Sequence, residues 1–157
     1  HMIVYKTDRT RAYFFRQMLV TIAIILSPIL YDKLFPGSFI KDSYYWIAVA
    51  IILMTLIDEA SNYRLTEIQF DTDKREIIFN SRTIFSSSKK DRLAFDNAGL
   101  EIVQGRSKFK WLSEPMVLYF LKNKTEIIEI KRSKDGFSVD TMKEIISTVE
   151  KLSLPAM

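Results

Sequence analysis

Two adjacent carboxylates, Asp58 and Glu59, come closest to a reactive pair in this sequence. Two carboxyl groups that converge on one point can act as general acid and base, or hold a divalent cation. Neighbouring residues on a helix point about 100° apart and do not face each other. We therefore expect this pair to mark the end of a helix emerging into water, and a carboxylate hydrolase is the least favoured reading.

Other reactive side chains are scarce. The chain has no cysteine, and its single histidine is His1, which together with Met2 resembles a cloning remnant. The four glycines are scattered, so no glycine-rich phosphate loop exists. Asp71 and Asp73 lie in a predicted turn, where their own backbone uses them. We predict no catalytic residue, no metal site and no cofactor, and hence a protein that is not an enzyme.

Two short basic segments, residues 88–92 and 105–111, are the candidates for binding. In the second of them, alternation places the cations on one face of a predicted strand and Phe109 and Trp111 on the other. Near a bilayer each such cation can attract anionic headgroups by about 1 kcal/mol. The alternative, a solvated outer face over a core-facing Phe109 and Trp111, is the one that the pattern favours. The candidate lipid- or partner-binding residues are Lys89, Lys90, Arg92, Arg106, Lys108 and Lys110.

Two uncharged runs of 14 residues, 18–31 and 44–57, dominate the N-terminal part of the chain. As helices they would extend about 21 Å, less than the roughly 30 Å of a bilayer core. Both are apolar all round, however, so every side must be covered. A domain of about 100 residues has too little surface to enclose them. We predict a transmembrane helical hairpin over residues 12–57 in preference to a buried soluble one.

The flanks of the runs support the membrane interpretation. Aromatic residues gather where membrane interfaces would fall, and two cations stand close enough to the first run to reach the headgroups. Pro36 and Gly37 in the connection allow the chain to reverse, and Pro28 is expected to kink the first helix and expose a carbonyl. The predicted interface residues are Arg16, Lys33, Tyr44, Tyr45 and Trp46.

The distribution of positive charge gives an orientation. Residues 1–11 form a basic N-terminal segment with Lys6, Arg9 and Arg11, and Arg16 follows, whereas each lysine of the connection stands beside an aspartate. The positive-inside rule places the N-terminus in the cytoplasm, and two crossings return the chain there. We expect a multi-pass protein of the bacterial inner membrane, with both termini cytoplasmic.

From residue 58 onward the sequence reads as a separate domain, 58–157, rich in both charge signs. Alternation and turn residues predict about seven short antiparallel strands in a sandwich or open barrel. Ser138 can cap a closing amphipathic helix. The predicted strands are 65–70, 75–79, 82–85, 93–95, 99–103, 107–112, 116–121 and 126–132.

The order of these elements, with YRLTEIQFDTDKREIIF as the opening strand pair and VLYFLKNKTEIIEIKRSKDGFSVDTMKEIISTVEKL as the closing hairpin and helix, resembles the bacterial pleckstrin-homology-like membrane proteins. The resemblance implies an α+β fold and a membrane-tethered scaffold without enzymatic activity. Phosphoinositide-binding relatives use basic residues at the loop joining the first two strands. The turn taken for that loop here, residues 71–74, is mostly acidic, so inositol phosphate binding is not expected.

Two hypotheses of function follow. The first is a non-enzymatic scaffold or interaction module that binds a protein partner, itself as a homo-oligomer, or anionic lipid at the cytoplasmic face. The second is a regulatory subunit of a larger membrane transport or envelope-synthesis complex. Nucleic acid is not an expected partner, because residues 58–157 carry 17 Lys and Arg against 16 Asp and Glu and show no stacking motif.

Overall fold

The computed structural model describes residues 1–35, 41–85, 87–104 and 116–152, which fall into two compact units. The hairpin unit comprises Thr10–Asn62 and Thr83–Ser87, and the described remainder forms the sheet unit. The sheet unit thus includes residues 1–9, ahead of the hairpin, in addition to the C-terminal part of the chain in which we predicted it.

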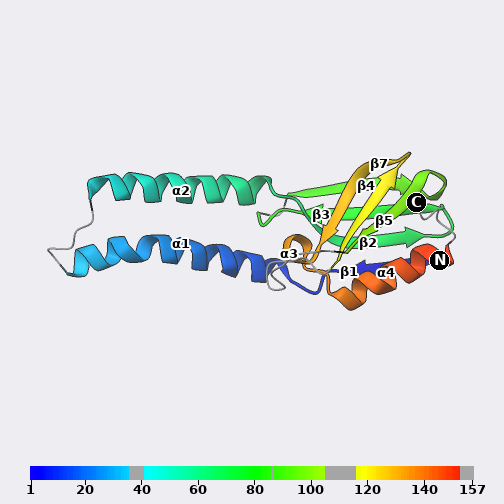
Figure 1. Ribbon diagram of the computed structural model, residues 1–157, viewed down its shortest axis with the longest axis horizontal. Coiled ribbons are helices and arrows are strands. Elements are labelled where there is room, and N and C mark those ends of the chain that lie inside the picture. The colour runs from blue at the N-terminus through cyan, green and yellow to red at the C-terminus, as the bar shows by residue number, and fades with distance from the viewer. Residues whose placement is uncertain (36–40, 86, 105–115, 153–157) are drawn as a thin grey trace. The chain divides into compact units, whose positions relative to one another are not determined.

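The hairpin unit contains two long helices, α1 (Arg11–Leu34) and α2 (Asp42–Ser61), which run side by side in Figure 1. They have 24 and 20 residues, so they extend about 36 Å and 30 Å. Both helices continue beyond the uncharged runs, because flanking residues such as Arg16 and Glu59 are good enough helix formers to extend them by a turn or more. The helices are therefore long enough to cross the roughly 30 Å core of a bilayer, although the uncharged runs alone are not.

A narrow seam joins the two helices. Along each helix the buried and half-buried apolar residues recur every three or four positions, which is the spacing of one helical face. The remaining faces of both helices point outward. The seam residues are Phe14, Met18, Ile22, Ile25 and Ile29 on α1, with Tyr45, Ala48, Ile52 and Leu56 on α2.

The sheet unit contains seven strands in two antiparallel sheets, and no closed barrel forms among its described residues (Figure 1). The first sheet has the order β1-β2-β3-β4 and the second the order β5-β6-β7. The predicted α+β class with about seven strands is therefore confirmed. The strands are β1 (Met2–Lys6), β2 (Arg64–Asp71), β3 (Glu76–Arg82), β4 (Ser88–Ala94), β5 (Ala98–Val103), β6 (Val117–Lys122) and β7 (Thr125–Lys131).

Strand β1 was not predicted from the sequence. It pairs antiparallel with β2 from Met2 opposite Asp71 to Lys6 opposite Glu67, and Ile3 and Tyr5 pack against the core. The hairpin is consequently inserted between two neighbouring strands. Our placement of the turn at residues 71–74 between the first two strands was wrong: it joins β2 and β3, and the hairpin joins β1 and β2.

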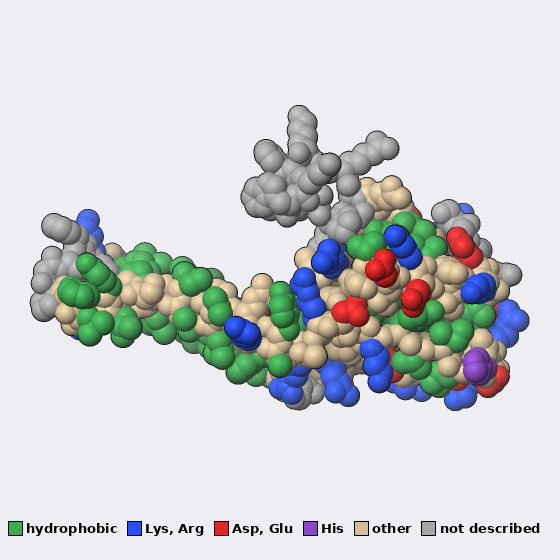
Figure 2. Space-filling model, turned by 90° about the horizontal axis from the view of Figure 1, so that it is seen from below, with side chains coloured by type: hydrophobic (Ala, Val, Ile, Leu, Met, Phe, Trp, Pro, Cys, Tyr) green, Lys and Arg blue, Asp and Glu red, His purple; other side chains and the backbone are tan. Residues whose placement is uncertain are grey.

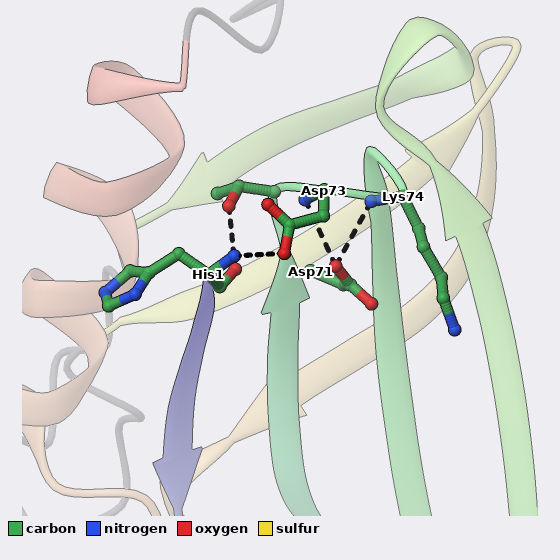
Figure 3. A network of polar contacts seen from close by, with 5 residues as sticks. His1, Asp71, Asp73 and Lys74 are labelled. Atoms are coloured by element: carbon green, nitrogen blue, oxygen red, sulfur yellow. Dashed lines mark hydrogen bonds and ion pairs between the residues drawn. The ribbon is translucent and has the colours of Figure 1, made fainter.

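The turns have the chemistry that their sequences predict. In the turn after β2, the Asp71 carboxylate accepts hydrogen bonds from the backbone N–H groups of Asp73 and Lys74, both at 3.1 Å (Figure 3). Between β6 and β7, Asn123 and Lys124 both have positive φ, as a type I′ hairpin turn requires. The expected use of Asp71 by its own backbone is confirmed.

One predicted strand, residues 82–85, was wrong. Strand β3 already ends at Arg82, and Thr83 turns the chain, since its N–H donates to the Ser87 carbonyl at 2.9 Å. The next strand, β4, starts at Ser88 and not at Leu93 as predicted. Its pairing with β3 along the whole length outweighs the weak strand propensity of consecutive charged residues. The predicted strand 107–112 lies outside the described residues.

The C-terminal helix α4 (Val139–Lys151) closes the core as predicted. The Ser138 hydroxyl accepts from the Thr141 N–H at 3.1 Å and caps the first turn. Met142, Ile145 and Val149 are buried in one cluster with residues of both sheets. Two short helices not predicted, η1 (Phe95–Asn97) and α3 (Arg132–Asp135), precede β5 and α4.

Asp135, at the end of α3, connects several backbone segments of the sheet unit. Its Oδ1 accepts from the Leu65 N–H at 2.9 Å and its Oδ2 from the Lys131 N–H at 3.0 Å. Its carbonyl accepts from the Thr7 hydroxyl at 2.6 Å. The side chain is 2% exposed, so the two amides depend on this carboxylate. One residue therefore fixes the ends of β1 and β7 and the start of β2.

The glycine that follows completes this junction. Gly136 has φ +80, and a Cβ there would lie 2.6 Å from the Cβ of Arg9. Asp8, next to Arg9, accepts from the Ser138 N–H at 2.7 Å. The segment that leads from β1 toward α1 is thus packed closely against the chain between α3 and α4.

The position of β1 predicts which fragment folds. A variant in which residues 1–9 are joined to 63–157 by a Gly/Ser linker of about four residues should be soluble and cooperatively folded, because Lys6 and Glu67 are cross-strand partners. Residues 63–157 alone should be less stable, since β2 loses β1, one of its two partner strands, and Ile3 and Tyr5 leave the core. Urea unfolding of both chains measures this difference. Equal stabilities would contradict the structural role of β1.

Asp135 provides a second prediction, measured in the same linked variant. Asp135→Ala should lower the free energy of unfolding by about 2–5 kcal/mol, because two backbone N–H groups lose their acceptor. Asp135→Asn should cost less, since one amide oxygen can still accept. A loss below about 1 kcal/mol for Asp135→Ala would contradict this account.

The pH dependence gives a third prediction. Burial raises the pKa of Asp135 above its ordinary value of 3.8, against the lowering effect of the hydrogen bonds from Lys131 and Leu65. The folded state therefore favours the protonated form. This contribution is fully present below about pH 3.8 and is lost as pH rises through the raised pKa. The stability of the Asp135 protein relative to Asp135→Asn should increase on acidification through that window, as urea titrations at several pH values would show.

Candidate functional site

The outward faces of the hairpin form the largest apolar surface among the described residues. Only 11% and 6% of the most apolar stretches of α1 and α2 are buried, and both helices are long and apolar enough to cross a membrane. Figure 2 shows hydrophobic side chains over most of the visible hairpin surface. The exposed large residues are Tyr13, Phe15, Leu19, Val20, Ile24, Leu26, Leu30, Tyr31, Leu34, Trp46, Ile47, Val49, Ile51, Leu53, Met54 and Ile57.

Polar side chains within the hairpin bond to their own helix. The Thr21 hydroxyl donates to the Gln17 carbonyl at 3.1 Å and the Thr55 hydroxyl to the Ile51 carbonyl at 2.8 Å. Ser27 donates to the Ile24 carbonyl at 2.8 Å, which compensates for the N–H that Pro28 lacks. Hydroxyl groups satisfied in this way can face hydrocarbon at low cost.

The predicted interface residues occupy both ends of α1 and the start of α2. Near the connection, the Tyr45 hydroxyl donates to the Asp32 carboxylate, and the Lys33 ammonium lies 5.9 Å from the centroid of the Tyr45 ring. The Tyr44 hydroxyl donates to the Ile25 carbonyl at 3.2 Å. Trp46, by contrast, is 77% exposed.

Arg16 lies toward the other end of α1 and is exposed. Its separation from Lys33 is 17 helical residues, or about 25 Å along the helix axis. The two cations are therefore spaced close to the thickness of a bilayer core, and their long side chains can bridge the remainder.

The first basic segment lies on β4, an edge strand among the described parts of its sheet. Two of its three cations have acidic neighbours: Lys89 lies 3.0 Å from Asp91, and Arg92 lies 3.6 Å from Glu76. The cations of these pairs are exposed and their acidic partners are half-buried. The pairs reduce the net charge of the strand, although each contributes little to stability. Lysines on an edge strand also oppose pairing with another sheet. Protection of this sheet edge is a structural role for Lys89 and Lys90 that requires no bound ligand.

The second basic segment, with Arg106, Lys108 and Lys110, lies outside the described residues. Its predicted cationic face and the predicted core positions of Phe109 and Trp111 stay predictions.

The adjacent carboxylates Asp58 and Glu59 lie in the last turn of α2, where the Asp58 carbonyl accepts from the Asn62 N–H at 2.9 Å. Successive positions on the helix direct the two side chains apart. The described residues contain no cluster of three or more Asp, Glu or His that could hold a metal ion.

A pocket of about 170 Å³ in the sheet unit was not anticipated from the sequence. Its lining includes Lys89, Asp91, Glu129, Lys134 and Asp135, contributed by β4, β7 and α3. The spacing of residues along the sequence does not predict such a site, because its residues come from distant segments. The sequence signal available was the pair Asp135-Gly136, which marks a turn.

The carboxylates of this pocket are already engaged. Asp91 pairs with Lys89, and Asp135 accepts two backbone N–H groups. Burial acts to raise the pKa of Glu129, but hydrogen bonds from Lys131 and Tyr119 outweigh it and hold that pKa below its ordinary value. Glu129 is thus an ionised acceptor, 3.0 Å from the Tyr119 hydroxyl and 2.6 Å from the Lys131 ammonium. The geometry favours a charge network over a general acid.

Comparison with known proteins adds no assignment. No protein-family model matches the chain, and searches of curated proteins and of solved structures find no match. The class of this protein therefore rests on the structure alone. It has two apolar helices that could span a membrane and a unit of antiparallel sheets.

Proposed function

We propose that this protein is a non-enzymatic, membrane-tethered interaction module. The observation that carries the proposal is the hairpin: two helices of 24 and 20 residues expose large apolar side chains on every face except one narrow seam. In water, this exposed apolar surface would cost roughly 25 cal/mol of free energy per Å². A lipid bilayer covers such a surface. The hydroxyl groups of Thr21, Ser27 and Thr55 can face its hydrocarbon at low cost, because they are bonded to carbonyls of their own helices.

The orientation follows from charge. Lys6, Arg9, Arg11 and Arg16 precede or begin α1, so the positive-inside rule favours cytoplasmic termini in a multi-pass protein of the inner membrane. The sheet unit then works at the cytoplasmic face.

The sheet unit supports a pleckstrin-homology-like scaffold. Its seven antiparallel strands followed by an amphipathic helix support this resemblance, although the hairpin follows β1 and does not precede the whole unit as the resemblance implies. The inserted hairpin occupies the connection between the first two strands. A headgroup site at that connection, as in phosphoinositide-binding relatives, is not part of the proposal.

The partner that we favour is a protein or a second copy of the chain. The ion pairs at Lys89 and Arg92 leave β4 with little uncompensated charge for anionic lipid. The alternative of a regulatory subunit in a transport or envelope-synthesis complex uses the same hairpin surface, with partner helices in place of part of the lipid.

Detergent extraction tests the membrane assignment. The full-length protein should sediment with membranes, resist high salt and carbonate, and enter solution only with detergent. The linked variant, residues 1–9 joined to 63–157, should stay in the supernatant without detergent. A full-length protein that is soluble and monodisperse in buffer would refute the proposal. Purification in mild detergent then shows the partner: a stoichiometric larger membrane protein would favour the regulatory-subunit alternative.

Vesicle sedimentation of the linked variant tests the lipid alternative. We expect less than about a twofold difference between neutral and anionic vesicles, because the charge of β4 is largely paired. A stronger preference for anionic vesicles that Lys89→Gln/Lys90→Gln abolishes would restore lipid as the ligand. Lys143→Gln/Lys151→Gln, which removes two exposed lysines from α4, is the control with the same net charge.

A further inference from the structure

The turn between β3 and β4, Thr83–Ser87, is part of the hairpin unit and not of the sheet unit that flanks it in sequence. The Thr83 N–H donates to the Ser87 carbonyl at 2.9 Å, and the Ser87 N–H donates to the Thr83 hydroxyl at 3.2 Å. Thr83 is 2% exposed. These reciprocal bonds hold the two ends of the turn together.

The turn is attached to the first turn of α1. The Arg11 Nε–H donates to the Ile84 carbonyl, and the Ile84 side chain is 2% exposed although it lies outside the core cluster of the sheet unit. Arg11 is separated from Arg16 by five residues, or about 7.5 Å along the helix. The headgroup layer on each side of a bilayer has a similar thickness, about 5–8 Å.

The tip of the turn carries Phe85, which is 47% exposed. A single exposed phenylalanine is ordinary. This one, however, follows Ile84, whose carbonyl is bonded to the start of α1, a helix apolar enough to cross a membrane. Tyr13 and Phe15, on the next residues of that helix, are 43% and 41% exposed. Aromatic side chains at this level are typical of membrane interfaces.

We propose that Phe85 inserts into the interfacial layer of the bilayer, at the level of Tyr13 to Arg16, so that the β3–β4 turn is a second membrane contact beside the hairpin. The occupant of this surface is lipid, because the turn is continuous with helix faces that lipid must cover. The inference rests on the proposed membrane function. It adds a second membrane anchor, the turn that is bonded to α1 through Arg11. This turn lies outside the two long hydrophobic runs of the sequence.

Site-directed spin labelling tests the inference on the full chain, since the absence of cysteine leaves no background labelling. Single variants Phe85→Cys, Ile24→Cys and Glu126→Cys are labelled with a nitroxide and reconstituted in lipid nanodiscs. Ile24 is 66% exposed on α1 and reports the bilayer interior, and exposed Glu126 on β7 reports water. Power saturation compares the accessibility of each label to oxygen and to a water-soluble nickel chelate.

We expect the oxygen-to-nickel ratio at position 85 to lie between those at 24 and 126, and to fall to the value at 126 when the nanodiscs are replaced by an amphipathic polymer without lipid. A ratio at 85 equal to that at 126 in nanodiscs, with a high ratio at 24, would overturn this inference and leave the membrane hairpin standing. A ratio at 24 equal to that at 126 would overturn the proposed membrane function and the inference with it.

Discussion

The pairing of β1 with β2 is the constraint on which the rest of the sheet unit depends. The long hairpin is inserted between these strands, and Lys6, the last residue of β1, is the cross-strand neighbour of Glu67, near the start of β2. An antiparallel pair brings its two connected ends together, so a hairpin of any length can be accommodated there. Asp135 then holds both connections through Thr7 and Leu65.

The hairpin follows a different physical rule. Inside the sheet unit, apolar side chains from both sheets and α4 cover one another. In the hairpin, only one seam is covered, and the remaining apolar faces are exposed along the whole length of both helices. Such a surface requires lipid or other helices, whereas the hydroxyl groups of Thr21, Ser27 and Thr55 are satisfied by carbonyls of their own helices. The two units therefore require different surroundings within one chain.

The charged residues show how pairing changes the meaning of a sequence pattern. In the sequence, Lys89 and Arg92 belong to a basic segment that contains one acidic residue, Asp91. In the fold, Asp91 and Glu76 lie beside them on β4 and β3. Asp135 shows the opposite case: a single acidic residue in a turn becomes the acceptor for amides from two strands. The Arg92–Glu76 pair and the bonds of Asp135 do not follow from spacing, because their partners belong to different elements. Lys89 and Asp91, by contrast, are two positions apart on β4.

Local signals predicted much of the fold. The capping by Ser138, the turns at Asp71 and Asn123, and the periodicity of α4 depend on residues a few positions apart, so the sequence contains them. The strand predicted over 82–85 failed because hydrogen bonds between Thr83 and Ser87 compete with strand pairing. Strand β1 was missed because five residues ahead of a hairpin carry too weak an alternation to be distinguished from a tail.

The sequence by itself determined the two apolar helices, the class of the sheet unit and the absence of cysteine and usable histidine chemistry, since these depend on composition and short-range periodicity. Tertiary structure alone decided that the N-terminus joins the sheet, that the hairpin interrupts a strand pair, that Asp135 secures both connections and that the turn of Phe85 lies against α1. Each of these depends on contacts between residues far apart in the chain, whose pairing is set by the free energy of the whole fold and not by any local pattern.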